Sequence, residues 1–93
     1  METLTIDIDE RLIREHGKEV DHTCGCPAFF WLEEHGFAPT YVGYEYAALE
    51  DGRILGFPQE FVWWQQDAVL VMKDEGVDPR TVLRPITFTA VLE

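Results

Sequence analysis

The stretch that decides the fold is PQEFVWWQQDAVLVMKDE, residues 58–75, which holds two of the chain's three tryptophans. It is longer than most strands, and Gly76 followed by Pro79 is a typical end of a helix. We therefore predict a helix over residues 58–75. Two segments within it, VWW and AVLVM, have good β propensity, so a pair of strands is the alternative.

The predicted helix has two unlike faces. At about 100° per residue, one broad face is apolar and is expected to meet the core. It consists of Phe61, Val62, Trp64, Ala68, Val69, Val71 and Met72. Trp63 and Leu70 lie seven residues apart on the other face, beside polar and acidic residues. This second face either binds a partner, since Trp is frequent in interfaces, or is covered by a loop or by the first crossover.

The segment before the helix, residues 41–57, predicts a β-hairpin. Asp51-Gly52 is a favoured pair for a two-residue type I′ loop. Pairing outward from that loop sets Glu50 opposite Arg53, and the register follows from there. It places six residues on the face of the sheet that meets the core: Val42, Tyr44, Tyr46, Ala48, Leu55 and Phe57.

The other elements follow from alternation and from helix-capping residues. Residues 3–7 and 86–92 alternate between apolar and polar, which predicts a half-buried strand at each end of the chain. Asp9 is placed to cap one short helix, and Pro27 to begin a second. Asp78 begins a single turn before the last strand.

The predicted order is therefore strand, helices, strand, strand, helix and strand. We predict one α+β domain over residues 1–93, with a four-stranded antiparallel sheet and helices packed on one face. The expected arrangement is the ferredoxin-like βαββαβ order. A different α+β order of the same elements is the alternative.

The charge of the chain restricts its partners. There are 18 acidic and 7 basic residues, a formal net charge of −11. This balance disfavours direct binding to nucleic acid or to an anionic membrane, and it favours a protein partner with a basic surface. Acidity that serves only solubility is the competing interpretation. No apolar run approaches the ~20 residues of a membrane span, and no signal peptide is recognisable, so we expect a cytoplasmic protein.

His22, Cys24, Cys26 and His35 form a candidate zinc site, because zinc takes four nitrogen or sulfur ligands. However, Cys-x-Cys is an unusual spacing, and cysteine is often simply buried. Cys26 also precedes Pro27 at a helix N-terminus, a position that activates thiols, and His22 is a candidate base. We predict no metal and no cofactor, and keep a zinc-stabilised or thiol-active module as the alternative.

The sequence contains no catalytic motif that we recognise, so we expect a binding protein and not an enzyme. The predicted partner-binding residues are Trp63, Leu70, Glu60, Gln66, Asp67 and Asp74 on the helix, with Glu50 and Asp51 at the hairpin tip. The expected function is to bind another protein and to block a basic surface that normally holds nucleic acid. In size and acidity the chain is similar to phage-encoded inhibitors of host nucleases, including anti-CRISPR proteins, which act in the host cytoplasm. A self-associating structural protein, such as a homodimer, is a further alternative.

Overall fold

The structure is a computed structural model that describes residues 2–19 and 26–93. In these residues, five strands form one antiparallel sheet in the order β1-β5-β4-β3-β2. The strands are β1 (Glu2–Ile8), β2 (Pro39–Val42), β3 (Tyr46–Leu49), β4 (Ile54–Gly56) and β5 (Ile86–Leu92). The helices are α1 (Glu10–His16), α2 (Pro27–Glu34) and α3 (Gln59–Glu75), with short 3-10 turns η1 (Gly17–Glu19) and η2 (Pro79–Thr81).

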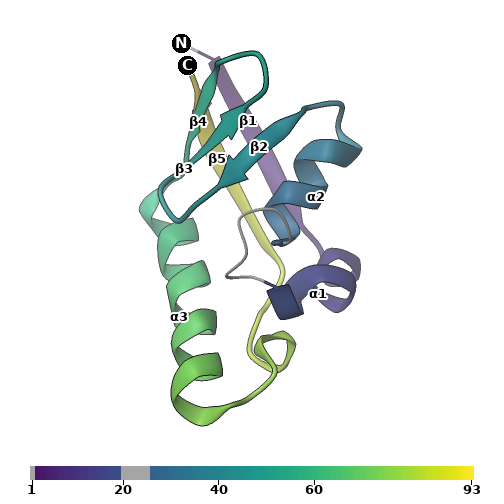
Figure 1. The fold of residues 1–93 in the computed structure, drawn as a ribbon, viewed down its shortest axis with the longest axis vertical. Coiled ribbons are helices and arrows are strands. Elements are labelled where there is room, and N and C mark those ends of the chain that lie inside the picture. The colour runs from purple at the N-terminus through teal and green to yellow at the C-terminus, as the bar shows by residue number, and fades with distance from the viewer. Residues whose placement is uncertain (1, 20–25) are drawn as a thin grey trace.

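The two terminal strands, β1 and β5, pair along their full length. Glu2 lies opposite Leu92 and Ile8 opposite Ile86, which brings the two ends of the chain together (Figure 1). β1 forms one edge of the sheet and β2 the other. The chain crosses between these edges through α1 and α2, and α2 contacts both edge strands. These two helices therefore lie on one face of the sheet.

The predicted strand alternation and helix capping are confirmed in β1 and α1. Ile6 and Ile8 are buried, whereas Thr5 between them is exposed. Asp9 is the N-cap of α1, and its carboxylate accepts a hydrogen bond of 2.9 Å from the backbone N–H of Leu12. Such a bond satisfies a donor that the first turn of a helix leaves free.

The predicted long helix is also confirmed, as α3, and Gly76 ends it with φ at +65°. Only the first turns of α3 meet the sheet. There Phe61 stacks on Phe88, with ring centroids 4.1 Å apart, and meets Phe57 edge-on at 4.8 Å. The helix then continues past the end of the sheet (Figure 1), and Leu83 packs against its inner side. The molecule is consequently elongated, at 39 × 22 × 19 Å.

The predicted four-stranded, ferredoxin-like order is not confirmed. In that order the first strand is interior and the last is at an edge. Here β5 is interior, between β1 and β4, and β1 is at the edge. The first and last strands pair in both orders, so the difference lies in where the hairpin attaches. Here β4 pairs with β5, through Leu55–Leu92 and Gly56–Val91, and leaves β1 at the edge.

The β3–β4 hairpin differs from the prediction in its loop. A type I′ loop needs positive φ at both central residues, but only Gly52 has it, at +91°. Leu49 N–H donates to the Arg53 carbonyl and Gly52 N–H to the Leu49 carbonyl, both at 3.0 Å. The loop therefore has three residues, 50–52. The Asp51 carboxylate holds it by accepting from the backbone N–H and the Nε of Arg53, at 3.0 and 2.7 Å.

This extra loop residue shifts the register by one position. Tyr46 pairs with Gly56 and Ala48 with Ile54. Because successive side chains of a strand point to opposite faces, the whole of β3 is reversed relative to the prediction. Ala47 and Leu49 are buried instead. The prediction that Tyr44, Tyr46 and Ala48 face the core is wrong.

The hairpin also contains a turn that the prediction lacked. The segment predicted as one strand is two, β2 and β3, joined by residues 43–45. Gly43 N–H donates to the Tyr46 carbonyl at 2.9 Å and closes this turn. A side chain at Gly43 would collide with Tyr41, because a Cβ there would lie 2.5 Å from the Tyr41 hydroxyl oxygen. The close approach of the Tyr41 ring explains the glycine.

Candidate partner-binding surface

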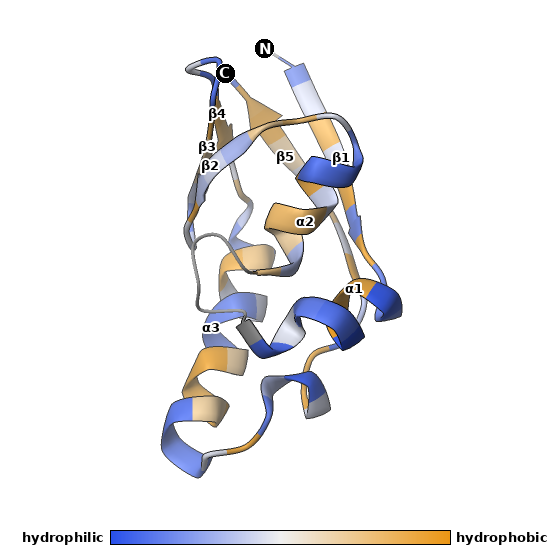
Figure 2. Ribbon diagram, turned by 45° about the vertical axis from the view of Figure 1, so that its right-hand side comes forward, coloured by the Kyte–Doolittle hydropathy of each residue, from blue (hydrophilic) through white to orange (hydrophobic). Residues whose placement is uncertain are grey.

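α3 separates its residues into a packed inner face and an exposed outer face. The buried residues of the inner face are Phe61, Val62, Gln65, Ala68 and Val69. Gln65 is polar, but its amide donates to the Tyr44 carbonyl at 3.1 Å and ties α3 to the β2–β3 turn. In Figure 2 apolar and polar bands alternate along α3, as expected for a helix with one packed face.

Trp63 and Leu70 dominate the outer face. They are 59% and 56% exposed, the highest values among the large exposed apolar residues of the described chain. Seven residues make nearly two helical turns, so the two side chains form one row along the helix. The alternative in which a loop or the first crossover covers Trp63 is therefore wrong.

An acidic row runs beside this apolar row. Glu60, Asp67 and Asp74 are also spaced by seven residues, and all three are exposed. Seven residues turn the helix by about 20° less than two full turns, so the row stays beside Trp63 and Leu70 over its length of roughly 21 Å. Gln59, Gln66 and Lys73 form a third row on the opposite side of the apolar row. We call these three rows together the α3 stripe.

The carboxylates of the acidic row are available to a partner. In residues 2–19 and 26–93, no Lys or Arg nitrogen lies within 4.0 Å of Glu60, Asp67 or Asp74. Other acidic residues of the described chain are paired by arginine, and these pairs are Arg11 with Glu15 and Glu34, Arg53 with Asp51, and Arg80 with Asp78. Within the described residues, the acidic row of α3 therefore forms no ion pair with Lys or Arg.

A groove borders the acidic row. Its volume is about 250 Å³, and it is lined by Trp64, Asp67, Ala68, Val71, Val82, Leu83 and Arg84. Its walls are mainly apolar, and Asp67 places a carboxylate at its rim. Val82, which also lines the groove, is 42% exposed. The groove extends the α3 stripe sideways onto the segment that precedes β5.

The structure does not bring the predicted hairpin-tip residues to α3. Glu50 and Asp51 lie in the loop that precedes β4, whereas α3 begins after β4 ends, so a whole strand separates the two places. Arg53 already pairs with the carboxylate of Asp51, and its hydrogen bonds lower the pKa of that carboxyl. The predicted partner-binding residues therefore form two separate surfaces, of which the α3 stripe is the larger.

The candidate zinc and thiol residues are only partly described. His22 and Cys24 lie outside the described residues. Cys26 is 2% exposed at the start of α2, and burial of this kind disfavours a reactive thiol. His35 is at the opposite end of α2, roughly 13 Å away along the helix axis. Its Nδ1 lies 2.8 Å from the Trp31 carbonyl oxygen. Cys26 and His35 are thus too far apart to share one zinc ion.

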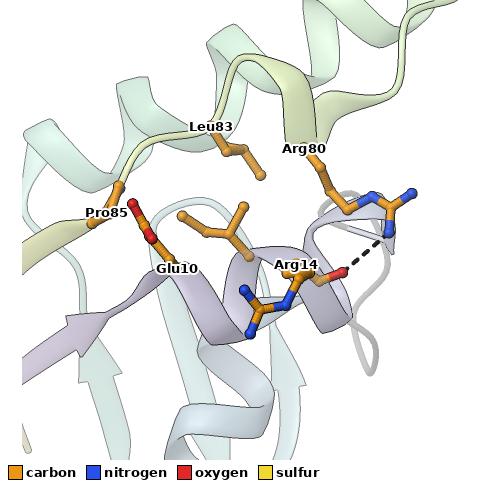
Figure 3. Close-up of a pocket in the computed structure, with 6 residues that line it drawn as sticks. Glu10, Arg14, Arg80, Leu83 and Pro85 are labelled. Carbon is orange, nitrogen blue, oxygen red and sulfur yellow. Dashed lines mark hydrogen bonds between the residues drawn. The ribbon is translucent and has the colours of Figure 1, made fainter.

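A second pocket lies between α1 and the segment after η2 (Figure 3). Its volume is about 330 Å³, and its lining residues are Glu10, Ile13, Arg14, Arg80, Leu83 and Pro85. Arg80 is held by Asp78 at 2.6 Å and donates to the Arg14 carbonyl at 3.1 Å. Hydrogen bonds to Asp78 from the side chain and the backbone N–H of Arg80 lower the pKa of Asp78 to about 2. Because the two arginine side chains point in different directions, they do not converge on one ligand (Figure 3).

Sequence reasoning missed the exposed residues of the sheet. Tyr41, Tyr46 and Ile54 are 37%, 45% and 39% exposed. The register error assigned Tyr46 to the core and so concealed this patch. Gly43 signals the break between β2 and β3, since an isolated glycine inside a strand pattern suggests a bulge or a close backbone approach. The orientation of Tyr46 depends instead on the number of residues in the 50–52 loop, for which the sequence offers no decisive signal.

Comparison with known proteins does not assign this chain to a family. No family model, no curated protein and no solved structure matches it. Among the described residues, no helix has the length and apolar character needed to cross a membrane. Within the same residues, no group of three or more His, Cys, Asp or Glu side chains is placed to hold a metal ion.

Proposed function

We propose that this chain is a small acidic module that binds another protein through the α3 stripe. The observation that carries the proposal is the exposed pair Trp63 and Leu70, flanked by the acidic row, whose carboxylates pair with no Lys or Arg of the described residues. Aromatic residues at the centre of an interface often supply much of its binding energy, and surrounding charges steer the encounter. The partner would carry an apolar depression inside a basic surface.

Such a surface is typical of a site that holds nucleic acid, because phosphates are bound by Lys and Arg. We therefore propose that the module occupies a basic nucleic-acid-binding surface and blocks it. This is how a phage-type inhibitor of a host nuclease, such as an anti-CRISPR protein, would act in the host cytoplasm. The net charge of −11 supports recognition of a basic protein surface, because it disfavours direct contact with nucleic acid.

The α3 stripe alone is too small for a stable complex. A helix face of roughly 21 Å by 10 Å covers about 200 Å², against about 800 Å² per partner in a standard interface. The groove beside Asp67 provides the adjacent surface. A Lys or Arg of the partner would lay its aliphatic stem against Trp64 and Val71 and bring its charge to Asp67.

The experiment is capture from a bacterial extract on the immobilised chain, with identification of the captured proteins and release by a short nucleic-acid duplex. Replacement of Trp63 with Ala should weaken capture by about 30-fold or more, as loss of a central aromatic anchor does. Tyr44→Ala, a change at an exposed aromatic outside α3, is the matched control and should bind normally. Capture that is not released by nucleic acid would contradict the blocking role.

Charge reversal separates this proposal from acidity that serves only solubility. Changing Glu60, Asp67 and Asp74 to Lys alters the net charge by +6, from −11 to −5. Three exposed glutamates outside α3, namely Glu10, Glu33 and Glu45, give a control variant with the same net charge. The α3 variant should associate with the partner more slowly, and its association rate should no longer depend on salt. The control variant should keep the association rate and the salt dependence of the wild type. Equal effects would mean that only the total charge matters.

A further inference from the structure

Among residues 2–19 and 26–93, no helix lies on one of the two faces of the sheet. The core lies between the other face and the three helices, so the residues that alternate with the core positions point outward. We call this the outer sheet face. Its strand residues are exposed or half-buried in all five strands, and include Tyr41, Tyr46, Ile54, Thr5 and Thr89.

The half of this face formed by β2, β3 and β4 is apolar. The Tyr41 and Tyr46 rings lie side by side, with centroids 5.3 Å apart. Ala48 lies opposite Tyr41 on one side and Ile54 on the other. Gly43 provides the space into which the Tyr41 ring folds. These side chains form a continuous patch across three strands.

The half formed by β1 and β5 is polar but almost uncharged. Thr5 lies opposite Thr89, and their hydroxyl oxygens are 3.5 Å apart. Asp7 is the one charged residue among the strand positions that point to this face, and the Thr87 hydroxyl donates to its carboxylate at 3.0 Å. The outer sheet face thus contrasts with α3, α1 and the hairpin tip, where carboxylates are exposed.

We propose that two copies of this chain associate through the outer sheet face, with the two sheets packed face to face. Two chains that each carry −11 repel one another, so contact is favoured where neither presents charge. The strand spacing and rise give this face a projected area of roughly 20 Å by 20 Å on each copy. Two copies would therefore bury about 800 Å² in total, if the uneven height of the side chains is not counted. Stable specific interfaces bury at least about 1,200 Å² in total, so this dimer is weak and reversible.

The association does not involve the α3 stripe, so each dimer would present two such stripes. A partner with two binding sites could then engage both stripes of one dimer. The second contact would form at a high effective concentration, so the partner would be bound more tightly. The dimer and the proposed partner-binding function rest on different residues. Each can therefore fail without the other.

The test is sedimentation equilibrium of the whole chain over a range of concentrations up to about 1 mM, which resolves weak association. The average mass should rise from 10.8 kDa toward twice that value. Raising the salt concentration from about 0.05 to 0.5 M should strengthen the dimer, because it screens the repulsion between the two acidic chains. A mass of 10.8 kDa at every concentration and salt would overturn the proposal.

Two variants locate the interface. Tyr46→Lys and Thr89→Lys each place a charge on the outer sheet face, from β3 and from β5, and should raise the dissociation constant by about 30-fold or more. Trp63→Lys adds the same charge on α3 and should leave the dimer intact. Circular dichroism confirms that each variant is folded. If Trp63→Lys disrupts the dimer and the two sheet variants do not, the interface is on α3 and the proposal is wrong.

Discussion

Trp63 and Trp64 are adjacent in the sequence, but the helix gives them opposite environments. Trp64 is half-buried, its ring stacks on Phe61 at 5.4 Å, and its Nε1 donates to the Arg84 carbonyl at 2.7 Å. Trp63 is 59% exposed. A rotation of about 100° per residue is enough to separate them. One tryptophan therefore belongs to the packing of the domain, and the other presents a large apolar surface that folding leaves unused.

The largest expected effect is on the packed side, at Phe61. It is 1% exposed and its ring contacts three other aromatic rings. Replacement with Ala should lower the free energy of unfolding by about 3–5 kcal/mol, from lost burial and the cavity left behind. Urea denaturation followed by circular dichroism measures this change. A loss below about 1 kcal/mol would mean that α3 is not anchored at this point.

The next effect concerns Trp64, which was expected in the core and is half-buried. It packs against both buried clusters, so Trp64→Ala should cost about 2–4 kcal/mol in unfolding free energy. Trp64→Phe keeps a ring and removes the hydrogen bond to Arg84. This conservative change should cost about 1 kcal/mol. If both variants unfold like the wild type, the inner side of α3 is not what holds the 82–84 segment.

Acid should loosen the segment that covers the inner side of α3. Arg80 holds the pKa of Asp78 at about 2, below its ordinary value of 3.8. The unfolded chain therefore takes up this proton at a higher pH than the folded chain. The stabilisation is complete above about pH 4 and is lost as the pH falls toward 2. Thermal melts across this range should show a shallower acid-induced loss for Asp78→Asn, and an identical slope would contradict the role of this pair.

Local pattern was sufficient to predict most individual elements. The alternation in β1 and β5, the Asp9 cap, the Pro27 helix start and the long helix α3 all depend on residues close in sequence. Helical periodicity likewise placed Trp63 and Leu70 on the face opposite the core. Whether another segment covers that face depends on tertiary packing, so the exposure of Trp63 could not be predicted from local pattern.

The errors concern residue counts and long-range pairing. Asp51-Gly52 suits both a two-residue loop and a three-residue loop that places only Gly52 in the left-handed region. One residue in that loop decides whether Tyr46 faces the core or the solvent. The sheet order depends on which strand pairs with β5, and that choice is made by tertiary packing. The register error, which turned Tyr46 toward the core, hid the apolar patch of the outer sheet face.

The smallest expected effect on folding belongs to the exposed row, Trp63 and Leu70. Each change to Ala should alter the free energy of unfolding by less than about 0.5 kcal/mol, because both side chains already contact water. The most direct test combines this stability with capture, using the double variant Trp63→Ala, Leu70→Ala. We predict that its melting temperature is close to that of the wild type. It should no longer capture the protein that a nucleic-acid duplex releases from the wild-type chain. A double variant that is folded and still captures that partner would contradict the assignment of the α3 stripe as the binding surface.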